Sequence, residues 1–347
     1  MLQALACMSR GRVGIVLVID QEGKLINTIV DGDIRRALLT GMDFHGPISD
    51  LLDRMKTWTP SEPVTAKQCV DKAGLLKLMK KKHVRQIPIV DSEGRVVDLV
   101  TERELLPETD TPLQAVIMAG GFGKRLQPLT SDCPKPMLPV GDQPLLSVII
   151  EQLKNAGINK VSVTTHYLGY KIKDHFGDGS QWGVSLDYVD EDTPLGTAGA
   201  LGLMSKPQEP LLVINGDILS QVDYRAMLEY HNEHKAALTV GVRQYDMKVP
   251  FGVVNTKGAE VQSLEEKPLF SFLVNAGIYL LAPGTLRFIE VGKHLDMTDL
   301  IKILVAQEKK VVSFPIIEYW LDVGNPQDYE KAQQFMARNE ITKHLGI

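Results

Sequence analysis

The residues best suited to chemistry gather in one short segment, 120–136. Its glycines are Gly120, Gly121 and Gly123. They follow the apolar run 115–118, and two cations, Arg125 and Lys135, stand ten residues apart just beyond them. Glycines let backbone N–H groups approach phosphate oxygens closely, and arginine and lysine neutralise phosphate charge. The segment therefore predicts a phosphate-binding loop at the end of a buried strand.

Two common phosphate-binding motifs do not fit this spacing. A Walker A loop requires a glycine five residues before Gly123 and a serine or threonine after Lys124, and the sequence has neither. A dinucleotide-binding fingerprint requires a third glycine where Leu126 stands. The loop therefore belongs to a different class of phosphate site.

Two aspartates are candidate ligands of a metal ion. Asp217 comes shortly after the apolar run 211–214, within an Asn-Gly-Asp block, and Asp322 also follows an apolar strand. Ligands of open α/β sheets collect at the carboxyl ends of the strands. Mg²⁺ is held by one or two carboxylates together with phosphate oxygens and waters, so the pair predicts a magnesium site. Asp328, further along, is expected to stabilise the helix that follows it.

Together these motifs resemble the signature of the sugar-1-phosphate nucleotidyltransferases. The resemblance covers residues 114 to about 335, with five motifs in the family's order. The Leu-Gly-Thr-Ala-Gly block at 195–199 and the Trp-x-Asp-Val-Gly block at 320–324 look most like the guanylyl branch. The resemblance implies that Asp217 and Asp322 bind the metal. The catalytic residues that it implies are Arg125 and Lys135.

The resemblance also implies which residues bind the substrates. The implied nucleotide-binding residues are Gly120, Gly121, Gly123, Glu191, Gly196, Thr197 and Asp217. The implied sugar-phosphate-binding residues are Glu266, Lys267, Asn275 and Gly277. Glu191 would contact the nucleobase, and a carboxylate there suits guanine, which offers two N–H donors where thymine and uracil offer one. Lys267 would contact the phosphate of the acceptor.

The implied reaction moves a nucleotidyl group from an NTP, expected to be GTP, to a sugar 1-phosphate of the glucosamine, mannose or heptose type. The products are pyrophosphate and an NDP-sugar for surface glycan or nonulosonic acid synthesis. A phosphate oxygen is already nucleophilic at neutral pH, so catalysis requires positioning and charge neutralisation. Two alternatives stay open: thymidylyl or uridylyl transfer to glucose 1-phosphate, and a non-catalytic nucleotide-sugar sensor. The sensor predicts the loss of a charged site residue, and all are present.

The elements that must position these residues alternate along the chain from residue 113 onward. Apolar runs predict strands at 115–118, 161–164, 211–214 and 237–242. Helical stretches lie between them at 144–156 and 224–234. This alternation predicts an α/β domain over 113–347, with a Rossmann-like and mainly parallel sheet.

The first hundred residues repeat themselves at an offset of 71. Residues 18–26 align with 89–97, and in each copy an apolar strand enters an Asp-x-x-Gly turn that a second strand leaves. This is the pattern of a β-hairpin. Each copy then continues into a helix. Halves of this size cannot each bury a face alone, so they should pair into one module.

The two copies resemble CBS motifs and imply a tandem CBS pair, an α+β module, over residues 1–108. The first copy is truncated, since it begins almost at its helix, 2–10, without the family's leading strand. Such pairs often bind adenosine nucleotides. The residues that would do so here are Asp33, Thr101 and Glu104. A structural or dimerising role is the alternative. A polar hinge, 107–112, would join the two domains.

The composition is that of an ordinary globular protein, with 347 residues, 23% of them charged, and a net charge of −5. No long basic stretch is present, so nucleic acid is not an expected partner. The start of the chain is too short and too weakly apolar for a signal peptide, and no run approaches a membrane span. Three scattered cysteines favour a reducing compartment. We expect a cytoplasmic protein and a homo-oligomer.

Overall fold

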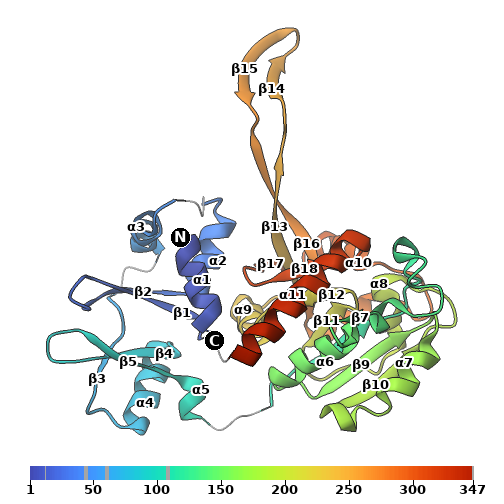
Figure 1. Cartoon of the computed structure of the whole chain (residues 1–347), viewed down its shortest axis with the longest axis horizontal. Helices are drawn as coiled ribbons and strands as arrows, with labels where there is room; N and C mark the ends of the chain where they lie inside the picture. Colours follow the sequence, from blue (N-terminus) through green and yellow to red (C-terminus); the bar gives the residue numbers. More distant parts are fainter. Residues whose placement is uncertain (12, 43–45, 59–61, 107–109, 346–347) are drawn as a thin grey trace. The chain divides into compact units, whose positions relative to one another are not determined.

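The structure is a computed structural model that describes residues 1–11, 13–42, 46–58, 62–106 and 110–345. Its contacts divide the chain into two compact units, Met1–Thr109 and Asp110–Ile347, which are coloured along the sequence in Figure 1. The predicted hinge at 107–112 lies partly outside the described residues. Within the described ranges, no helix combines the length and the apolar character that crossing a membrane requires.

Two antiparallel hairpins form the centre of the first unit. Their strands are β1 (Ile15–Ile19) with β2 (Leu25–Val30), and β4 (Gln86–Val90) with β5 (Val96–Thr101). In each turn an aspartate, Asp20 or Asp91, accepts hydrogen bonds from the backbone N–H groups two and four residues later. Such side-chain bonds stabilise tight turns. The repeated hairpin that the sequence predicts is therefore present in both copies.

The two halves of this unit contact each other through the hairpins. An isolated antiparallel bridge joins Lys24 to Arg95, and Gln86 Nε2 donates a 2.9 Å hydrogen bond to the Val13 carbonyl. The other elements of the unit are α1 (Leu2–Gly11), α2 (Asp31–Leu39), α3 (Ile48–Trp58), β3 (Ala66–Lys67), α4 (Lys72–Lys82) and α5 (Glu102–Leu105). Helix α1 precedes the hairpin of the first copy, and β3 and α4 precede the hairpin of the second copy.

One central sheet organises the second unit. Its strands, in spatial order, are β10 (Ser185–Asp190), β9 (Lys160–Thr165), β6 (Gln114–Met118), β11 (Leu211–Asn215), β16 (Leu269–Leu281), β13 (Leu238–Lys248) and β17 (Val311–Pro315). Neighbours are parallel except where β16 runs antiparallel to β11 and β13. The prediction of an α/β domain with a mainly parallel sheet is confirmed.

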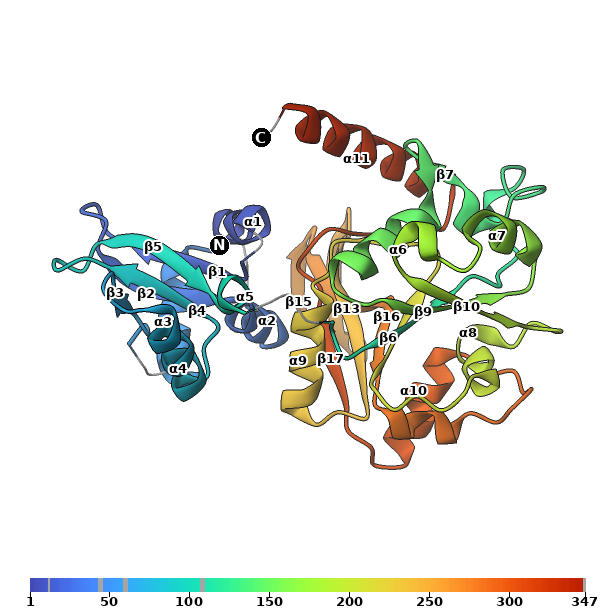
Figure 2. The same cartoon turned by 90° about the horizontal axis from the view of Figure 1, so that it is seen from below.

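Helices cover both faces of this sheet (Figure 2). One face packs against α6 (Leu145–Asn155), α7 (Gly169–Phe176) and α9 (Tyr224–His234), and the other against α8 (Gly196–Gly199) and α10 (Met297–Ala306). Successive side chains of a strand point to opposite faces. Accordingly Ala115 and Ile117 of β6 join the first cluster and Val116 joins the second. The buried sheet is thus a firm platform for groups at its carboxyl edge.

Short elements lie at that edge. They are β7 (Pro139–Val140) paired with β8 (Gln143–Pro144), β12 (Ile218–Ser220) paired with β18 (Trp320–Asp322), and the helix α11 (Pro326–Leu345). Asn325 caps α11, because its Oδ1 accepts from the Asp328 N–H at 3.0 Å while its Nδ2 donates to the Asp328 carboxylate at 2.6 Å. The expectation that Asp328 stabilises this helix is confirmed.

A long two-stranded arm leaves the sheet of the second unit. It consists of the outer parts of β13 and β16, continued by the hairpin of β14 (Gly252–Lys257) and β15 (Glu260–Glu266). Figure 1 shows it extending away from the body of the unit. The predicted strand 237–242 is correct for the buried part, but β13 continues to Lys248 because β16 remains paired with it beyond the core.

Candidate active site

The glycine loop leads from the carboxyl end of β6 into two 3₁₀ turns, η1 (Lys124–Leu126) and η2 (Lys135–Met137). Gly123 has a φ of 64°, which glycine adopts without strain. A side chain there would press against Thr130, whose hydroxyl donates a 2.9 Å hydrogen bond to the Gly123 carbonyl. This glycine therefore permits the sharp turn that leads into the first cation-bearing segment.

A cavity of about 420 Å³ opens beside the loop. Its lining residues are Gly121, Phe122, Gly123, Lys124, Arg125, Leu126, Lys135, Asp217 and Gly324. The predicted phosphate loop and one of the predicted metal ligands thus share a cavity. Lys124, to which the sequence gives no role, adds a third cation, and its Nζ lies 5.5 Å from the centre of the Phe122 ring.

The small sheet of β12 and β18 brings the two aspartates together. Asp217 stands between β11 and β12, and Asp322 pairs with Ile218, the next residue after Asp217. The Val323 N–H donates to the Asp217 carbonyl at 2.9 Å. The expectation that Asp322 follows an apolar strand needs correction. It is itself the last residue of β18, which pairs with β12 and is not a strand of the central sheet.

Charges of both signs converge at this point. Lys135 Nζ donates to Asp217 Oδ2. A Cβ on Gly324 would lie 3.1 Å from Asp322 Oδ1 and 3.2 Å from Arg125 Nη1, so both groups approach this glycine. Burial raises the pKa of Asp322 and the Asp217 carboxylate raises it further, while Lys135 and Arg125 oppose the rise. The four charged side chains form one electrostatic cluster.

The two carboxylates fit a divalent cation. Asp217 Oδ1 and Asp322 Oδ1 are both buried without a hydrogen-bond partner. A buried carboxylate oxygen in that state is costly unless a cation compensates it. Among the residues that the structure describes, no group of three or more His, Cys, Asp and Glu side chains could hold a metal. Two carboxylates suffice for Mg²⁺ when substrate phosphates and waters supply the remaining ligands.

The structure adds Asn215 to the candidate site. Its Oδ1 is buried without a partner, and a Cβ on Gly277 would lie only 2.7 Å from its Nδ2. Gly277 has a φ of 69°, so the backbone and the close approach both favour glycine there. The sequence feature that could have indicated Asn215 is the Asn-Gly-Asp block. Sequence reasoning selected only the aspartate of this block, as a metal ligand.

Asn275 shapes the strand segment that holds Gly277. Its Oδ1 accepts from the Gly277 N–H at 3.0 Å, and its Nδ2 donates to the Tyr279 hydroxyl at 2.8 Å. Tyr279 pairs with Val240 and Asn275 pairs with Val242. Between these two pairs β16 has more residues than β13, so the register shifts. Bulges of this kind re-aim side chains beside functional sites. Asn275 thus supports the wall on which Gly277 meets Asn215.

Glu191 lies against the glycine loop and is 8% exposed. Its Oε2 accepts from the Leu195 N–H at 2.9 Å, and its carbonyl lies 2.7 Å from His166 Nδ1. A Cβ on Gly120 would meet Glu191 Oε1 at 2.6 Å. One carboxylate oxygen therefore organises the segment that leads into α8. The other oxygen, Oε1, faces Gly120, whereas the guanine prediction assumes that the whole carboxylate is available.

Gly196 and Thr197, for which nucleotide binding is predicted, make close contacts with the segment before α10. The Thr197 N–H and hydroxyl both donate to Asp296 Oδ1, at 3.0 and 3.2 Å, and the hydroxyl accepts from the Met297 N–H at 2.8 Å. A Cβ on Gly196 would lie 2.7 Å from the Leu295 carbonyl oxygen. The small residue at position 196 therefore makes room for the segment before α10.

Glu266 and Lys267 do not line the cavity beside the glycine loop. They lie on the arm, where their side chains are 67% and 58% exposed. Lys267 Nζ is 3.9 Å from Glu266 Oε1. The outer part of β16 separates them from Asn275 and Gly277. The predicted acceptor-binding residues therefore fall into two groups, one at the body and one on the arm.

In the first unit, the three candidate ligand-binding residues cap helices. The Asp33 carboxylate accepts from the Val30 N–H at 3.1 Å at the start of α2, and Glu104 accepts from the Thr101 N–H at 2.8 Å at the start of α5. The Thr101 hydroxyl accepts from the Glu104 N–H at 3.3 Å. Burial raises the pKa of Asp33. The equivalent position of each repeat thus holds a capping carboxylate.

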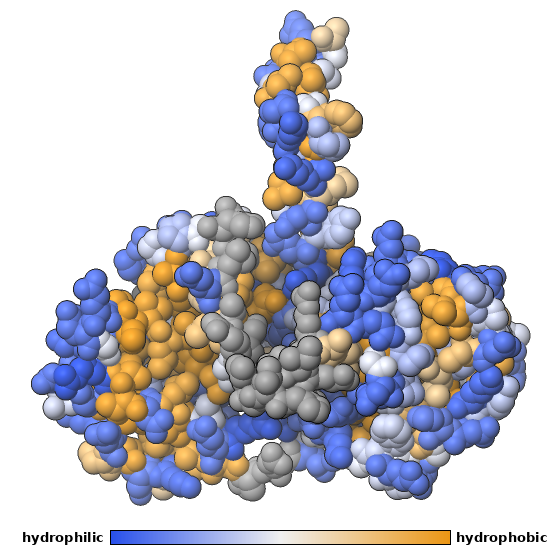
Figure 3. Space-filling model, in the orientation of Figure 1, coloured by the Kyte–Doolittle hydropathy of each residue, from blue (hydrophilic) through white to orange (hydrophobic). Residues whose placement is uncertain are grey.

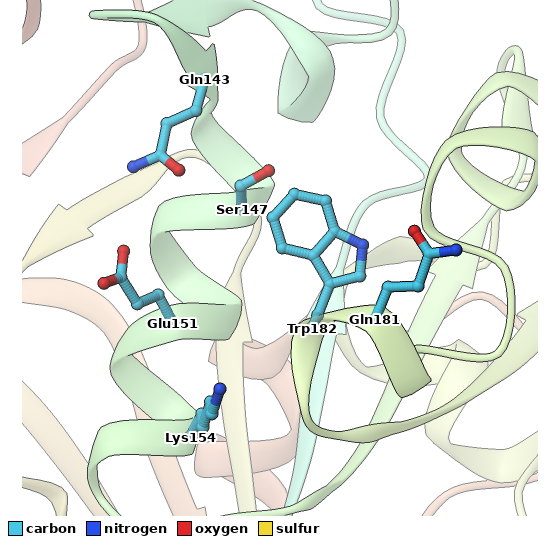
Figure 4. A pocket seen from close by; sticks show the side chains of 6 residues that line it. All are labelled: Gln143, Ser147, Glu151, Lys154, Gln181 and Trp182. Carbon is cyan, nitrogen blue, oxygen red and sulfur yellow. The ribbon is translucent and has the colours of Figure 1, made fainter.

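A second cavity, of about 210 Å³, lies beside α6 and η3 (Ser180–Trp182), as Figure 4 shows. Its lining residues are Gln143, Ser147, Glu151, Lys154, Gln181 and Trp182. The Ser147 hydroxyl is buried without a hydrogen-bond partner. None of the predicted site residues lines this cavity, so we do not include it in the candidate active site.

Known protein families match both parts of the chain. The family described as nucleotidyl transferase matches residues 114–339, and the CBS domain matches residues 75–108. The second match begins within α4, so it covers the second repeat. The two resemblances drawn from the sequence are confirmed.

Curated relatives are named for guanylyl transfer. The D-glycero-alpha-D-manno-heptose 1-phosphate guanylyltransferase of Aneurinibacillus thermoaerophilus is 33% identical over 225 residues, which are 64% of this chain and 97% of the relative. The mannose-1-phosphate guanyltransferase of Pichia angusta is 34% identical over 232 residues, and the match covers 62% of each protein. The chain therefore spans less than two thirds of the length of the Pichia relative.

A solved structure shares the fold of the second unit. It comes from Bacillus anthracis, is named as a glucose-1-phosphate thymidylyltransferase and holds a sucrose. The TM-score is 0.52 and the identity 26%, with 64% of this chain and 94% of that chain covered. The similarity in fold thus extends to a protein named for a different nucleobase.

Proposed function

This chain belongs to the nucleotidyl transferase family, and on that basis we propose that it transfers a guanylyl group from GTP to a sugar 1-phosphate. The observation that carries the proposal is the convergence of Arg125, Lys135, Asp217 and Asp322 beside a cavity lined by a glycine loop. The relatives named for heptose and mannose 1-phosphate support an acceptor of one of these types. Glucosamine 1-phosphate is a further candidate. The GDP-sugar would serve surface glycan or nonulosonic acid synthesis.

In this reaction an oxygen of the sugar phosphate attacks the α-phosphorus of the nucleotide. A new P–O bond forms, the bond from the α-phosphorus to the oxygen that bridges to the β-phosphate breaks, and pyrophosphate leaves with the electron pair. The attacking oxygen is anionic at neutral pH, so no general base is needed. Arg125 and Lys135 would neutralise charge on the leaving pyrophosphate and near the reacting centre.

Members of this family generally use a divalent metal. For this chain the ion we propose is Mg²⁺, held by Asp217 and Asp322, because each offers a buried oxygen that no protein group satisfies. When bound, the ion supplies charge neutralisation and orientation of the phosphate groups. Lys135 would keep the Asp217 carboxylate oriented through the bond that it donates to Oδ2.

Glu191 supports the choice of guanine. Its Oε1 lies beside the glycine loop, where its two lone pairs would accept from both guanine N1–H and N2–H, while uracil and thymine offer one N–H. Its Oε2 would stay bonded to the Leu195 N–H and hold the carboxylate in place. A charge-assisted hydrogen bond of this kind is worth about 1.5–3 kcal/mol. One such bond, which guanine makes in addition to those of uracil or thymine, is enough to separate these bases.

The first part of the chain, residues 1–108, would be a tandem CBS pair ahead of the transferase domain of residues 113–347. The family match to the second repeat and the two equivalent hairpins support this assignment. An adenosine nucleotide would bind near Asp33, Thr101 and Glu104. Because these residues already cap helices, a purely structural module is the alternative. The free cysteines support a reducing compartment such as the cytoplasm.

A pyrophosphate-release screen tests the proposed function. GTP, ATP, UTP and dTTP are each offered with mannose, heptose, glucosamine and glucose 1-phosphates, with Mg²⁺ and the full chain. We expect the fastest release from GTP with one of the first three sugars. Release only from UTP or dTTP with glucose 1-phosphate would contradict the guanylyl assignment. The Bacillus anthracis structure is the observation that keeps this alternative in the screen.

The screen also separates catalysis from sensing. A non-catalytic sensor would bind a GDP-sugar and release no pyrophosphate from any pair of substrates. The presence of Arg125, Lys135, Asp217, Lys267 and Asp322 argues against the sensor, since a degenerate site is expected to lose at least one of them.

A further inference from the structure

The arm presents one apolar face to solvent. Opposed residues of an antiparallel pair share a face, and so do residues two apart on one strand. The opposed pairs Tyr245–Phe272 and Met247–Phe270 therefore lie on the same face. Their side chains are 57%, 51%, 46% and 38% exposed, in that order. Figure 3 shows apolar surface on the arm.

A ribbon of this kind is poorly suited to stand alone. An isolated pair of strands is at best marginally stable in water, and stability requires further strands or a packing partner. Another exposed apolar pair, Val254 opposite Leu264, lies closer to the tip. The free edges of the ribbon are also ready to pair with another chain. The arm therefore has the properties of a segment that another surface covers.

The body of the same unit cannot provide that cover without breaking the ribbon. The pairing is continuous from Val242 opposite Asn275 to Lys248 opposite Leu269. At about 3.3 Å per residue, Lys267 stands roughly 26 Å along the strand from Asn275. Folding the arm back onto its own cavity would disrupt these backbone pairs.

The side-chain cations of the body do not match the charge of both substrates, since the proposed Mg²⁺ is offset by Asp217 and Asp322. The cations that line it in the described structure are Lys124, Arg125 and Lys135, and Lys135 already donates to Asp217. A sugar phosphate brings close to two negative charges in addition to those of the triphosphate. The lysine that the family resemblance assigns to the acceptor, Lys267, lies on the arm. On that assignment the residues expected at the acceptor site are divided between the body and the arm.

We propose that two copies of this chain exchange arms, so that Glu266 and Lys267 of one copy complete the acceptor site of the other. The proposal rests on the proposed function for the role of Lys267. A second copy meets both needs, because it has the same incomplete cavity and an identical arm to cover. A two-fold axis makes the exchange reciprocal. Aromatic and methionine side chains, as on the apolar face, are enriched at protein interfaces.

The arm face alone is too small for a stable interface, so the partner's body is expected to take part in the contact. A ribbon face about 10 Å wide and 40 Å long covers roughly 400 Å². Stable interfaces bury about 800 Å² on each partner. The remaining area has to come from outside the arm face, and the body of the partner, which holds the cavity, can provide it.

Complementation between two defective variants tests the exchange. Lys267→Ala removes the arm contribution and Asp217→Asn removes the body contribution, so each homo-oligomer should lose at least tenfold in kcat/KM. The two variants are co-expressed with different tags, and the mixed oligomer is isolated by both tags. Arm exchange gives one intact site in each mixed dimer, with about half of the wild-type activity. A mixed dimer no more active than the two variants alone would overturn the proposal.

A matched pair controls this experiment. Asp217→Asn and Asp322→Asn both alter the body, so arm exchange cannot place an intact site in their mixed dimer. We expect no recovery from that pair. Recovery there would overturn the proposal, because it would show that restored activity does not report exchange of the arm.

A crosslinking measurement separates this proposal from the proposed function, because it needs no turnover. The photoreactive substitution Lys267→p-benzoylphenylalanine is made in full-length protein, and ¹⁵N-labelled and unlabelled chains are co-folded. Crosslinks to the segment 120–136 that join labelled to unlabelled chains support the exchange, even if the nucleotide screen fails. Crosslinks to that segment only within one chain, or a wild-type protein that is monomeric by light scattering, would overturn it.

Discussion

Asp217 and Asp322 each keep one buried oxygen without a partner, and they lie in a cluster with Lys135 and Arg125. Asparagine would keep the shape of either side chain and remove its charge. Asp217→Asn and Asp322→Asn should therefore each lower kcat by roughly 100-fold or more, the size expected when an electrostatic contributor to phosphoryl-type transfer is lost. Steady-state pyrophosphate release at saturating Mg²⁺ measures the effect.

Asp328 provides a nearby comparison for this pair. It belongs to the segment that follows Asp322, but its carboxylate is bound to the Asn325 side chain at the start of α11. Asp328→Asn should cost some stability through the weakened cap and leave kcat within about twofold. Wild-type turnover in Asp217→Asn or Asp322→Asn would remove that residue from the proposed metal site.

Glu191 allows the nucleobase contact to be changed at a single atom. In Glu191→Gln the remaining oxygen can still accept from the Leu195 N–H, while the new NH₂ replaces Oε1 and faces the donors of guanine. The preference for GTP over UTP in kcat/KM should fall about tenfold or more, with little change in melting temperature. An unchanged preference would show that backbone groups select the base.

His231 gives the second unit a pH-dependent stability. It is 3% exposed, with Nδ1 2.8 Å from Thr239 Oγ1, and burial lowers its pKa from 6.5 to about 4. The unfolded chain therefore binds more protons between these pH values. The contribution of neutral His231 to the free energy of unfolding is complete above pH 6.5. It is lost as the pH falls towards 4, and its total is about 3 kcal/mol.

Urea denaturation at several pH values checks this effect. Between pH 7 and pH 4.5 the free energy of unfolding should fall more steeply for the wild type than for His231→Gln. Other groups that titrate in this range contribute equally to both proteins, so the difference isolates His231. Identical slopes would mean that folding does not lower the pKa of His231.

At the scale of elements, the glycine loop and the segment that follows β10 support each other. The contact is tight, because a Cβ on Gly120 would lie 2.6 Å from Glu191 Oε1. Gly120→Ala should therefore displace the carboxylate and raise KM for GTP about tenfold, with a smaller effect on kcat. Gly284→Ala is the control, since a Cβ there meets no atom within 4 Å. Equal KM values for Gly120→Ala and wild type would show that the loop does not depend on this contact.

The buried strands could be predicted from the sequence because their apolar residues follow the pattern expected for such strands. The apolar runs 115–118 and 211–214 became neighbouring parallel strands of the sheet. The arm was not predictable in the same way. Its strands mix polar and apolar residues, and only the pairing of β13 with β16 shows that they continue beyond the core. β18 was missed as an element of its own because a three-residue strand leaves too little pattern to recognise.

The candidate site divides along similar lines. Residues next to a strand end, such as Arg125 and Asp217, are placed by local sequence alone. Contacts between distant segments cannot be predicted from local sequence. The approach of Asn215 to Gly277 and the use of Thr197 by Asp296 depend on how β16 and α10 pack, and no local pattern encodes that packing.

At the scale of the whole molecule, the two compact units divide the chain into a repeat module and a transferase fold. The transferase unit collects its charged groups from segments nearly two hundred residues apart, Arg125 and Asp322 among them. Only the folded sheet and its edge elements bring these groups to one place. A central claim about the reaction therefore has to be tested on the intact chain.

The most direct measurement is the ratio of kcat/KM for GTP to that for UTP and dTTP, with the best acceptor found in the screen. The wild-type protein should favour GTP by a factor of about ten to 150, as the one additional charge-assisted hydrogen bond that guanine makes to Glu191 predicts. The GDP-sugar product should be identified directly by mass. Equal or better use of UTP or dTTP would contradict guanylyl transfer, and the absence of any nucleotide-sugar product would contradict transferase activity itself.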